Sequence, residues 1–310
     1  MRRLAVCSAV IPLFLAAVGE AAEVRATRHV YGKDAPAAQV LDAHLLNGDK
    51  PSPLLVYIVS GGWRSDPPRE TAPGPFQPYH DMGLSAVAVC HRTIDAQVAW
   101  PAPADDVARA IQFIRLHAEE WNIDPQRIAV TGRSSGGHVA MMVGFGEDRA
   151  DPASDEPVCR QSSAVRCVIE QGGPADLSVH IQEMLAADHI PADRKDYLRS
   201  RLQALLGVSE GDALSDDSLR RLQALSPLGL INRNTVPLLM LYTGPEGITS
   251  IDDPRLQWDT HTPISGFLLA AKLEQAGVPH KLVIAPDLGR GSTRSMEAQQ
   301  KFLRAHGIIE

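Results

Sequence analysis

The sequence lacks the motifs of two large classes of enzyme. It contains no H-E-x-x-H segment and no Cys/His spacing typical of zinc ligands, so a metalloenzyme is not expected. It also lacks G-x-G-x-x-G, because its glycine turn at residues 132–137 is centred on serine, which argues against a dinucleotide-binding enzyme. We therefore predict neither a metal nor a cofactor.

Internal repeats, low-complexity tracts and long runs of charge are also absent from the 310 residues. The formal net charge is −7, and 44% of the residues are hydrophobic. This modest charge gives no reason to expect nucleic acid or an anionic membrane surface as a partner. The length suits one large α/β domain or two small ones, and it leaves the oligomeric state open.

The N-terminus carries a long apolar run. Arg2 and Arg3 precede the almost wholly apolar segment Leu4–Val18, and Gly19-Glu20-Ala21 offers a small-x-small cleavage site. We predict a signal peptide over residues 1–21, a folded domain over 22–310, and a periplasmic or secreted protein. A retained membrane anchor is the alternative, but the run is short for a bilayer span, so no stable membrane insertion is expected.

Cysteine is scarce, and three of the four residues, Cys90, Cys159 and Cys167, follow the predicted signal peptide. An exported protein can form disulfides. Cys159 and Cys167 flank a short polar segment, which favours a bridge between them, with two free thiols as the alternative. Cys90 ends an apolar run and is predicted to be a buried strand residue.

Apolar runs alternate with segments of helical spacing along the rest of the chain. The segment 40–46, ending at Asn47-Gly48, suits an antiparallel edge hairpin, and the more polar helical stretch 177–235 is predicted to be an inserted cap. The alternation predicts an α/β fold with a mostly parallel sheet, helices on both faces, and a site beyond the carboxyl ends of the strands. Strands are expected at 54–59, 86–90, 128–130, 164–169, 236–242 and 281–285, and helices at 104–121, 264–275 and 293–306.

One turn carries the clearest chemical signal. Gly132-Arg133-Ser134-Ser135-Gly136 follows the apolar run Ile128-Ala129-Val130 and precedes a helical segment. This is the G-x-S-x-G pattern of a nucleophile elbow, in which a sharp strand-to-helix turn exposes the serine. We predict Ser134 as the nucleophile; the alternative is a small residue in an ordinary strand–helix turn.

Several segments make the chain resemble the α/β-hydrolase superfamily, specifically its secreted esterase and lipase branch, which contains hormone-sensitive-lipase-like and feruloyl- or acetyl-esterase-like enzymes. The resemblance spans roughly residues 36–306 and implies a central sheet of about eight strands and hydrolysis of a small-molecule ester. The segments that carry it, in chain order, are 57–65, Val89-Cys90-His91-Arg92, Ile123-Asp124-Pro125, the Ser134 turn, Gly173-Pro174-Ala175-Asp176 and Leu225-Ser226-Pro227.

The resemblance also implies an oxyanion hole. The backbone N–H of Ser135 and those of Gly61 and Gly62 are expected to donate to the developing negative charge. The family pattern His-Gly-Gly-Gly is replaced here by Val59-Ser60-Gly61-Gly62, so the histidine that braces this loop is missing. Trp63 follows in the same segment and is expected to contact the ligand. A plain glycine turn is the alternative.

The acid of a triad should follow the strand at 236–242. Asp259-Thr260-His261-Thr262-Pro263 resembles the family segment that carries it, although it lies unusually far from that strand. Glu246 or Asp253 are alternatives for the acid. The alternative role for Asp259 itself is to cap the helix that begins near Pro263.

The base departs most from the family pattern. The last strand is followed by Pro286-Asp287-Leu288-Gly289-Arg290-Gly291, so Arg290 stands where the family has histidine. Arginine remains protonated near neutral pH and cannot act as an ordinary general base. His261 is the best substitute among the histidines, ahead of His138, which suits a bracing role. Arg290 could instead bind an anion or pair with Asp259.

Two functions therefore remain open. The first is an exported serine hydrolase that acylates Ser134, with His261 or another group replacing the missing base. The second is a catalytically impaired or inactive homologue that binds a small ligand. The positive charge of Arg290 would favour a ligand that is an anion. The nature of the acyl and alcohol groups is not determined by the sequence.

Overall fold

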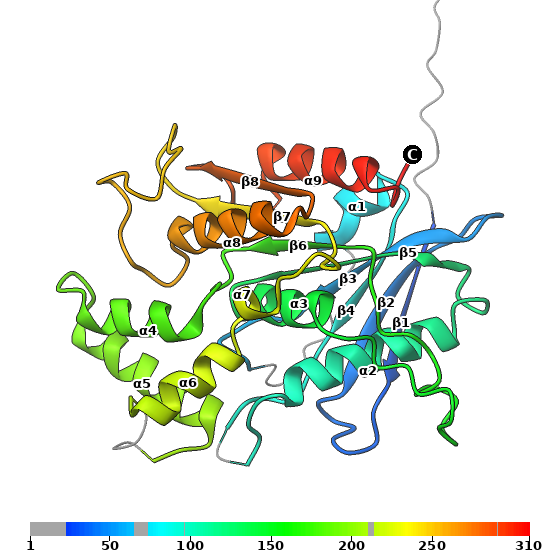
Figure 1. The fold of residues 1–310 in the computed structure, drawn as a ribbon. Coiled ribbons are helices and arrows are strands. Elements are labelled where there is room, and N and C mark those ends of the chain that lie inside the picture. The colour runs from blue at the N-terminus through cyan, green and yellow to red at the C-terminus, as the bar shows by residue number, and fades with distance from the viewer. Residues whose placement is uncertain (1–22, 65–73, 96, 210–213, 290) are drawn as a thin grey trace, which may run out of the picture.

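The computed structural model describes residues 23–64, 74–95, 97–209, 214–289 and 291–310. Over these ranges an eight-stranded sheet runs in the order β1-β2-β4-β3-β5-β6-β7-β8 (Figure 1). β1 and β2 pair antiparallel, as do β2 and β4, and the other neighbouring pairs are parallel. The strands are β1 (Val24–Val30), β2 (Val40–Leu46), β3 (Ser52–Ile58), β4 (Ser85–Val89), β5 (Ile123–Arg133), β6 (Cys167–Gln171), β7 (Leu238–Thr243) and β8 (His280–Ala285).

Helices cover both faces of this sheet, because consecutive strand side chains alternate between two apolar cores. On β3, Leu54 and Val56 belong to the core beneath one set of helices, and Leu55 belongs to the other. The first set is α2 (Ala102–Leu116), α3 (Ser135–Phe145) and α8 (Pro263–Ala276); the second is α1 (Gln77–His80) and α9 (Thr293–Ala305). The predicted α/β-hydrolase fold with a mostly parallel sheet is confirmed.

The N-terminal edge of the sheet differs from the prediction. β2 lies between β1 and β4, so the edge strand is β1 and the hairpin turn precedes β2 rather than falling at Asn47-Gly48. The sequence of β1, VRATRHV, is largely exposed and charged, as edge strands often are, so it has no apolar run to reveal it. An ion pair between Arg28 and Asp42, at 2.7 Å, ties β1 to β2.

The predicted bridge between Cys159 and Cys167 is wrong, because all three described cysteines are free thiols. Cys167 is buried in β6, in the core shared with α1 and α9. Cys159 contacts α2 on the opposite face of the sheet, where its sulfur accepts a hydrogen bond from Arg109 at 3.4 Å. The sheet therefore separates two thiols that are close in sequence.

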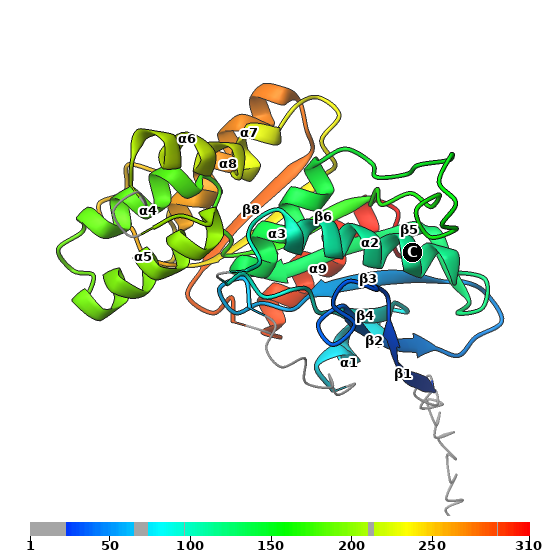
Figure 2. The same cartoon turned by 90° about the horizontal axis from the view of Figure 1, so that it is seen from below.

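The segment between β6 and β7 is helical. It contains α4 (Leu177–Ala186), α5 (Ala192–Leu206), α6 (Asp216–Ala224) and α7 (Pro227–Leu230). Both views show α4, α5 and α6 grouped outside the layers of the sheet (Figures 1 and 2). Their apolar side chains form a core of their own, which includes Ile181, Leu202 and Leu222. Among the described residues, no helix has the length and apolar character needed to cross a bilayer.

Candidate active site

Ser134 occupies a sharp turn between β5 and α3. Its φ of 53° and ψ of −125° form a strained conformation for a residue with a side chain. The flanking glycines permit it. A Cβ at Gly132 would lie 2.3 Å from the carbonyl carbon of Gly136, and a Cβ at Gly136 would lie 2.6 Å from the carbonyl oxygen of Ile58. The turn thus has the backbone geometry of a nucleophile elbow.

The loop that follows β3 lies against this turn. The Gly61 N–H donates to Ser135 Oγ at 3.2 Å, so this amide holds the loop and is not free for a substrate oxygen. Gly62 and Trp63 both have left-handed backbones, with φ of 68° and 59°. Within the described residues, the amides of Gly62 and Ser135 make no hydrogen bond. These two N–H groups remain available as donors.

His138 braces the loop from below. Trp63 Nε1 donates to His138 Nδ1 at 3.1 Å, and His138 Nε2 donates to the carbonyl of Leu225 at 2.8 Å. Burial lowers the pKa of His138 to about 4, so the ring is neutral near pH 7. One fully buried ring therefore links α3, the loop after β3 and the end of α6. The G-x-S-x-G sequence places His138 in the first helical turn after Ser134, but it does not predict the hydrogen bonds to Trp63 and Leu225.

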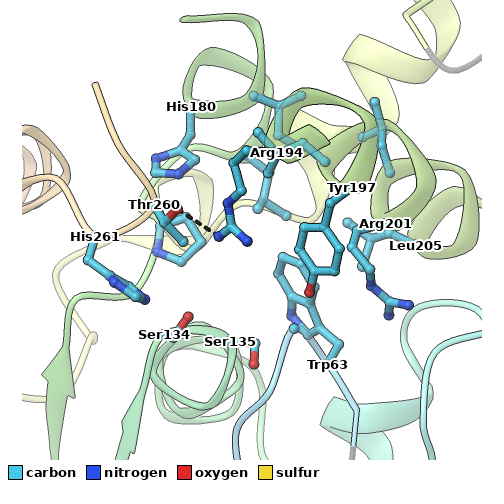
Figure 3. Close-up of a pocket in the computed structure, with 16 residues that line it drawn as sticks. Trp63, Ser134, Ser135, His180, Arg194, Tyr197, Arg201, Leu205, Thr260 and His261 are labelled. Atoms are coloured by element: carbon cyan, nitrogen blue, oxygen red, sulfur yellow. Dashed lines mark hydrogen bonds between the residues drawn. The ribbon is translucent and has the colours of Figure 1, made fainter. Parts of the chain in front are cut away.

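His261 and Ser134 share one pocket. Figure 3 shows the His261 ring and the Ser134 hydroxyl both pointing into it, above the first turn of α3. The Nε2 atom of His261 is buried and has no hydrogen-bond partner among the described residues. Burial lowers the pKa of His261 below 6.5; Arg133 lowers it further, whereas Asp259 raises it. The ring is therefore neutral at neutral pH.

The Asp259 side chain is exposed and accepts a hydrogen bond from the backbone. Its Oδ1 accepts a hydrogen bond from the N–H of His261 at 2.7 Å, in a tight turn before α8. The side chain that caps α8 belongs to Thr262, which accepts from Ile264 N. No hydrogen bond joins the Asp259 carboxylate to the His261 ring in the described part of the chain.

The other acid candidates lie in ion pairs at the surface. Asp253 pairs with Arg255 at 2.7 Å, and this interaction lowers the pKa of Asp253 to about 2. Glu246 pairs with Arg294 at 2.9 Å. Neither carboxylate lines the pocket that contains Ser134. Arg290, and the predicted signal peptide at 1–21, lie outside the described residues.

The pocket above Ser134 has a volume of about 150 Å³. Helices α4 and α5 supply most of its roof, including His180, Arg194, Tyr197 and Arg201, none of which is predicted from the sequence as a site residue. The sequence pattern did not mark these residues as pocket residues, because a charged residue on a polar helix usually faces solvent. The apolar part of the lining is Trp63, Leu177, Ile181, Leu198, Leu202 and Leu205.

Glu170 is a further buried titratable group that the sequence did not reveal. It is the second-last residue of β6, beside Gly132 of β5, and its Oε2 accepts from the N–H of Gly173 at 2.7 Å. Burial raises the pKa of Glu170 to about 8. Because it is fully enclosed below the elbow, it supports the turn from beneath and does not line the pocket.

No group of three His, Cys, Asp or Glu side chains in the described ranges has the arrangement of a metal site. The pocket offers the Ser134 hydroxyl, the His180 and His261 imidazoles, the Arg194 and Arg201 guanidinium groups, and the free amides of Gly62 and Ser135.

The chain is similar in sequence to a family model and to curated esterases. The BD-FAE family model matches residues 41–248, which is more than half of the chain. Among curated proteins, a probable carboxylic ester hydrolase, LipM of Mycobacterium tuberculosis, is 30% identical over 37% of this chain and 27% of its own length. The esterase LipC of the same organism is 25% identical over 75% of this chain and 54% of its own. The matches thus cover less than two thirds of either relative.

Solved structures show the same architecture. An acetyl ester-xyloside bifunctional hydrolase from Caldicellulosiruptor lactoaceticus has a TM-score of 0.66 at 25% identity and covers 87% of this chain and 89% of its own. The esterase Est2 of Thermogutta terrifontis, with propionate bound, has a TM-score of 0.60 at 23% identity over 94% of this chain and 96% of its own, which supports the fold. The chain therefore belongs to the BD-FAE family, within the esterases of the α/β-hydrolase fold.

Proposed function

We propose that this protein is a carboxylesterase that cleaves a small ester through an acyl intermediate on Ser134. The observation that carries the proposal is the strained Ser134 turn, open to a pocket that also contains the neutral His261 ring. Family membership and the esterase relatives support the reaction class.

In the proposed reaction, Ser134 Oγ attacks the ester carbonyl carbon while His261 accepts the hydroxyl proton. The amides of Gly62 and Ser135 donate to the oxyanion of the tetrahedral intermediate. His261 then gives the proton to the departing alcohol oxygen as the C–O bond breaks. Water, activated by the same ring, attacks the acyl group and frees Ser134.

Asp259 acts on this ring through the backbone and through its charge. Its carboxylate holds the turn that contains His261 and raises the pKa of the ring, without a hydrogen bond to the ring nitrogen. A base without an orienting carboxylate is less effective than one in a full triad. We therefore expect turnover well below that of a complete Ser-His-Asp triad.

The second candidate is an impaired or inactive homologue that binds a small anionic ligand in the same pocket. Two features favour it: Arg290 stands at the position of the family histidine, and His261 lacks a bonded acid. The intact elbow favours the esterase, because a binding protein needs no strained serine.

Hydrolysis of 4-nitrophenyl acetate by residues 22–310 separates the two. In the esterase, Ser134→Ala and His261→Ala each abolish a measurable parent activity. The inactive homologue predicts no parent activity, with hydrolysis appearing only in Arg290→His. Activity that survives Ser134→Ala would contradict a serine mechanism.

We also propose that the protein is exported, on the sequence of residues 1–21 alone. Expression with these residues, followed by N-terminal sequencing of the protein from each cell fraction, tests this. A periplasmic or secreted product that begins near residue 22 is expected, and an uncleaved product in the membrane fraction would overturn it.

A further inference from the structure

The roof of the Ser134 pocket is positively charged. Arg194 and Arg201 lie seven residues apart, on one face of α5, with Tyr197 between them. Figure 3 shows the Arg194 guanidinium directed into the pocket, toward the side that holds Ser134. The lining contains two arginines and two histidines, and no aspartate or glutamate among the described residues.

No described carboxylate pairs directly with either guanidinium, and Asp95 acts on Arg201 through its charge without a direct ion pair. Arg194 donates to the neutral hydroxyl of Thr260 at 2.7 Å and lies over the Tyr197 ring, 4.8 Å from its centre. Arg201 donates to the carbonyl of Ile94 at 2.9 Å. Within the described ranges, neither makes an ion pair within 4 Å, whereas Arg199 on the same helix pairs with Asp196 at 2.9 Å.

Two polar atoms of this lining also lack partners. The Nε atom of Arg201 is buried without a hydrogen bond to any described group. His180 is 6% exposed, and its Nδ1 is likewise buried and unpartnered. A buried donor without an acceptor, such as Arg201 Nε, and partly buried charges without counter-ions cost free energy that a matching ligand would recover. The pocket lacks an acceptor that carries negative charge.

We propose that the ester cleaved by this protein carries a carboxylate, and that Arg194 binds it in the pocket above Ser134, with Arg201 adding positive charge beside Gly62. The inference rests on the proposed esterase function for its chemistry, but the binding of the anion does not. A guanidinium binds a carboxylate through two parallel hydrogen bonds, which also orients the ester over the serine.

The pocket volume restricts the size of this substrate. About 150 Å³ is the order of a cavity that holds one benzene molecule, so a short dicarboxylic or hydroxy-acid ester fits within it. The carboxylate can belong to the acyl group or to the alcohol. Monoethyl succinate carries it on the acyl side, and acetoxyacetate carries it on the alcohol side.

The first experiment compares turnover of matched charged and neutral esters. Monoethyl succinate is compared with ethyl butyrate, and acetoxyacetate with ethyl acetate, following release of ethanol or acetate. We expect kcat/KM for one charged ester to exceed that of its neutral partner by about tenfold or more. Arg194→Gln should remove this preference, whereas Arg199→Gln, whose side chain does not line the pocket, should leave the preference unchanged.

The second experiment measures binding without turnover. Calorimetric titration of Ser134→Ala protein with the same esters should show binding of the charged one that weakens in 0.5 M NaCl and is lost in the Ser134→Ala/Arg194→Gln double variant. If Arg194→Gln fails to fold by circular dichroism, Arg194→Lys replaces it. Lysine keeps the charge but loses the paired donors, so affinity should fall while salt dependence remains.

The outcomes separate the two proposals. Arg194-dependent binding of a charged ester without turnover would overturn the esterase and support the anion site. Hydrolysis of neutral and charged esters at equal rates, unchanged in Arg194→Gln, would support the esterase and overturn the anion site. Charge preference that survives Arg194→Gln would also overturn the role of Arg194.

Discussion

The smallest residues around Ser134 decide its conformation. Glycine at 132 and 136 lets the backbone of β5, β3 and α3 approach more closely than any side chain permits. The strain at Ser134 is therefore maintained by packing around it and not by its own side chain.

Replacing Gly132 tests this directly. In Gly132→Ala, the added methyl would meet the Gly136 carbonyl carbon at 2.3 Å, and backbone atoms cannot rotate away. We expect the free energy of unfolding to fall by about 3 kcal/mol or more, measured by urea denaturation. Gly74→Ala is the matched control, because an added Cβ there meets nothing within 4 Å. Equal stability of the two variants would contradict this account of the elbow.

The pH dependence of hydrolysis tests His261 as the base. Because burial and Arg133 lower the pKa of His261 below 6.5, the ring stays neutral below that pH, and the acidic limb of kcat/KM should lie below pH 6.5. Asp259→Asn keeps an acceptor for the His261 N–H but removes the charge that raises the pKa, so the limb should move to lower pH.

Arg133→Gln gives the opposite displacement. Arg133 lowers the pKa of His261, so its removal should move the acidic limb toward higher pH. A limb that stays in place in both variants would exclude His261 as the group that titrates.

At the scale of elements, the His138 ring holds together the loop after β3, helix α3 and the helical segment between β6 and β7. His138 accepts from Trp63 on the loop and donates to Leu225 at the end of α6, and the Trp100 ring packs edge-on against it, with centroids 4.9 Å apart. The loop after β3 and the roof of the pocket therefore share a support.

Removing the His138 ring should weaken the packing of both the loop after β3 and the roof of the pocket. In His138→Leu, the Trp63 N–H and the Leu225 carbonyl lose their partners, which costs on the order of 1–3 kcal/mol for each group left buried. We expect a lower melting temperature, measured by differential scanning calorimetry, and reduced kcat/KM. His138→Gln can still donate and accept, so its loss of stability should be smaller. A leucine variant as stable as the parent would show that the bridge is not a support.

At the scale of the whole molecule, Glu170 couples folding to pH. Its pKa of about 8 in the folded state exceeds the ordinary value near 4.5, so the folded protein retains a proton that the unfolded chain releases. This contribution to the free energy of unfolding is fully present below about pH 4.5 and decreases as the pH rises toward 8.

Glu170→Gln should remove this loss. Between pH 6.5 and 8, we expect the free energy of unfolding of the parent to fall by on the order of 1–2 kcal/mol, and that of the variant to change less. Urea denaturation across this range measures it, with Glu297→Gln on the exposed side of α9 as control. Parallel pH profiles for parent and Glu170→Gln would contradict a protonated Glu170.

Local patterns predicted much of the fold. Continuous apolar runs such as Leu54–Val59 indicate strands buried on both faces, and G-x-S-x-G needs only five neighbouring residues to specify its turn. Strand β1 was not predicted, because its hydrophobic pattern is weak. Its residues are charged and exposed, so nothing in its sequence distinguishes it from a loop.

The amino-acid sequence by itself determined the α/β class, the elbow at Ser134 and the family, because each depends on residues close together in the chain. The sequence named His261 as the substitute base, but only the tertiary structure brings its ring into the Ser134 pocket, places the sheet between Cys159 and Cys167, and brings Arg194 of α5 over the pocket. These meetings join distant segments, and their positions depend on how the whole sheet and its helices pack, which no local spacing encodes.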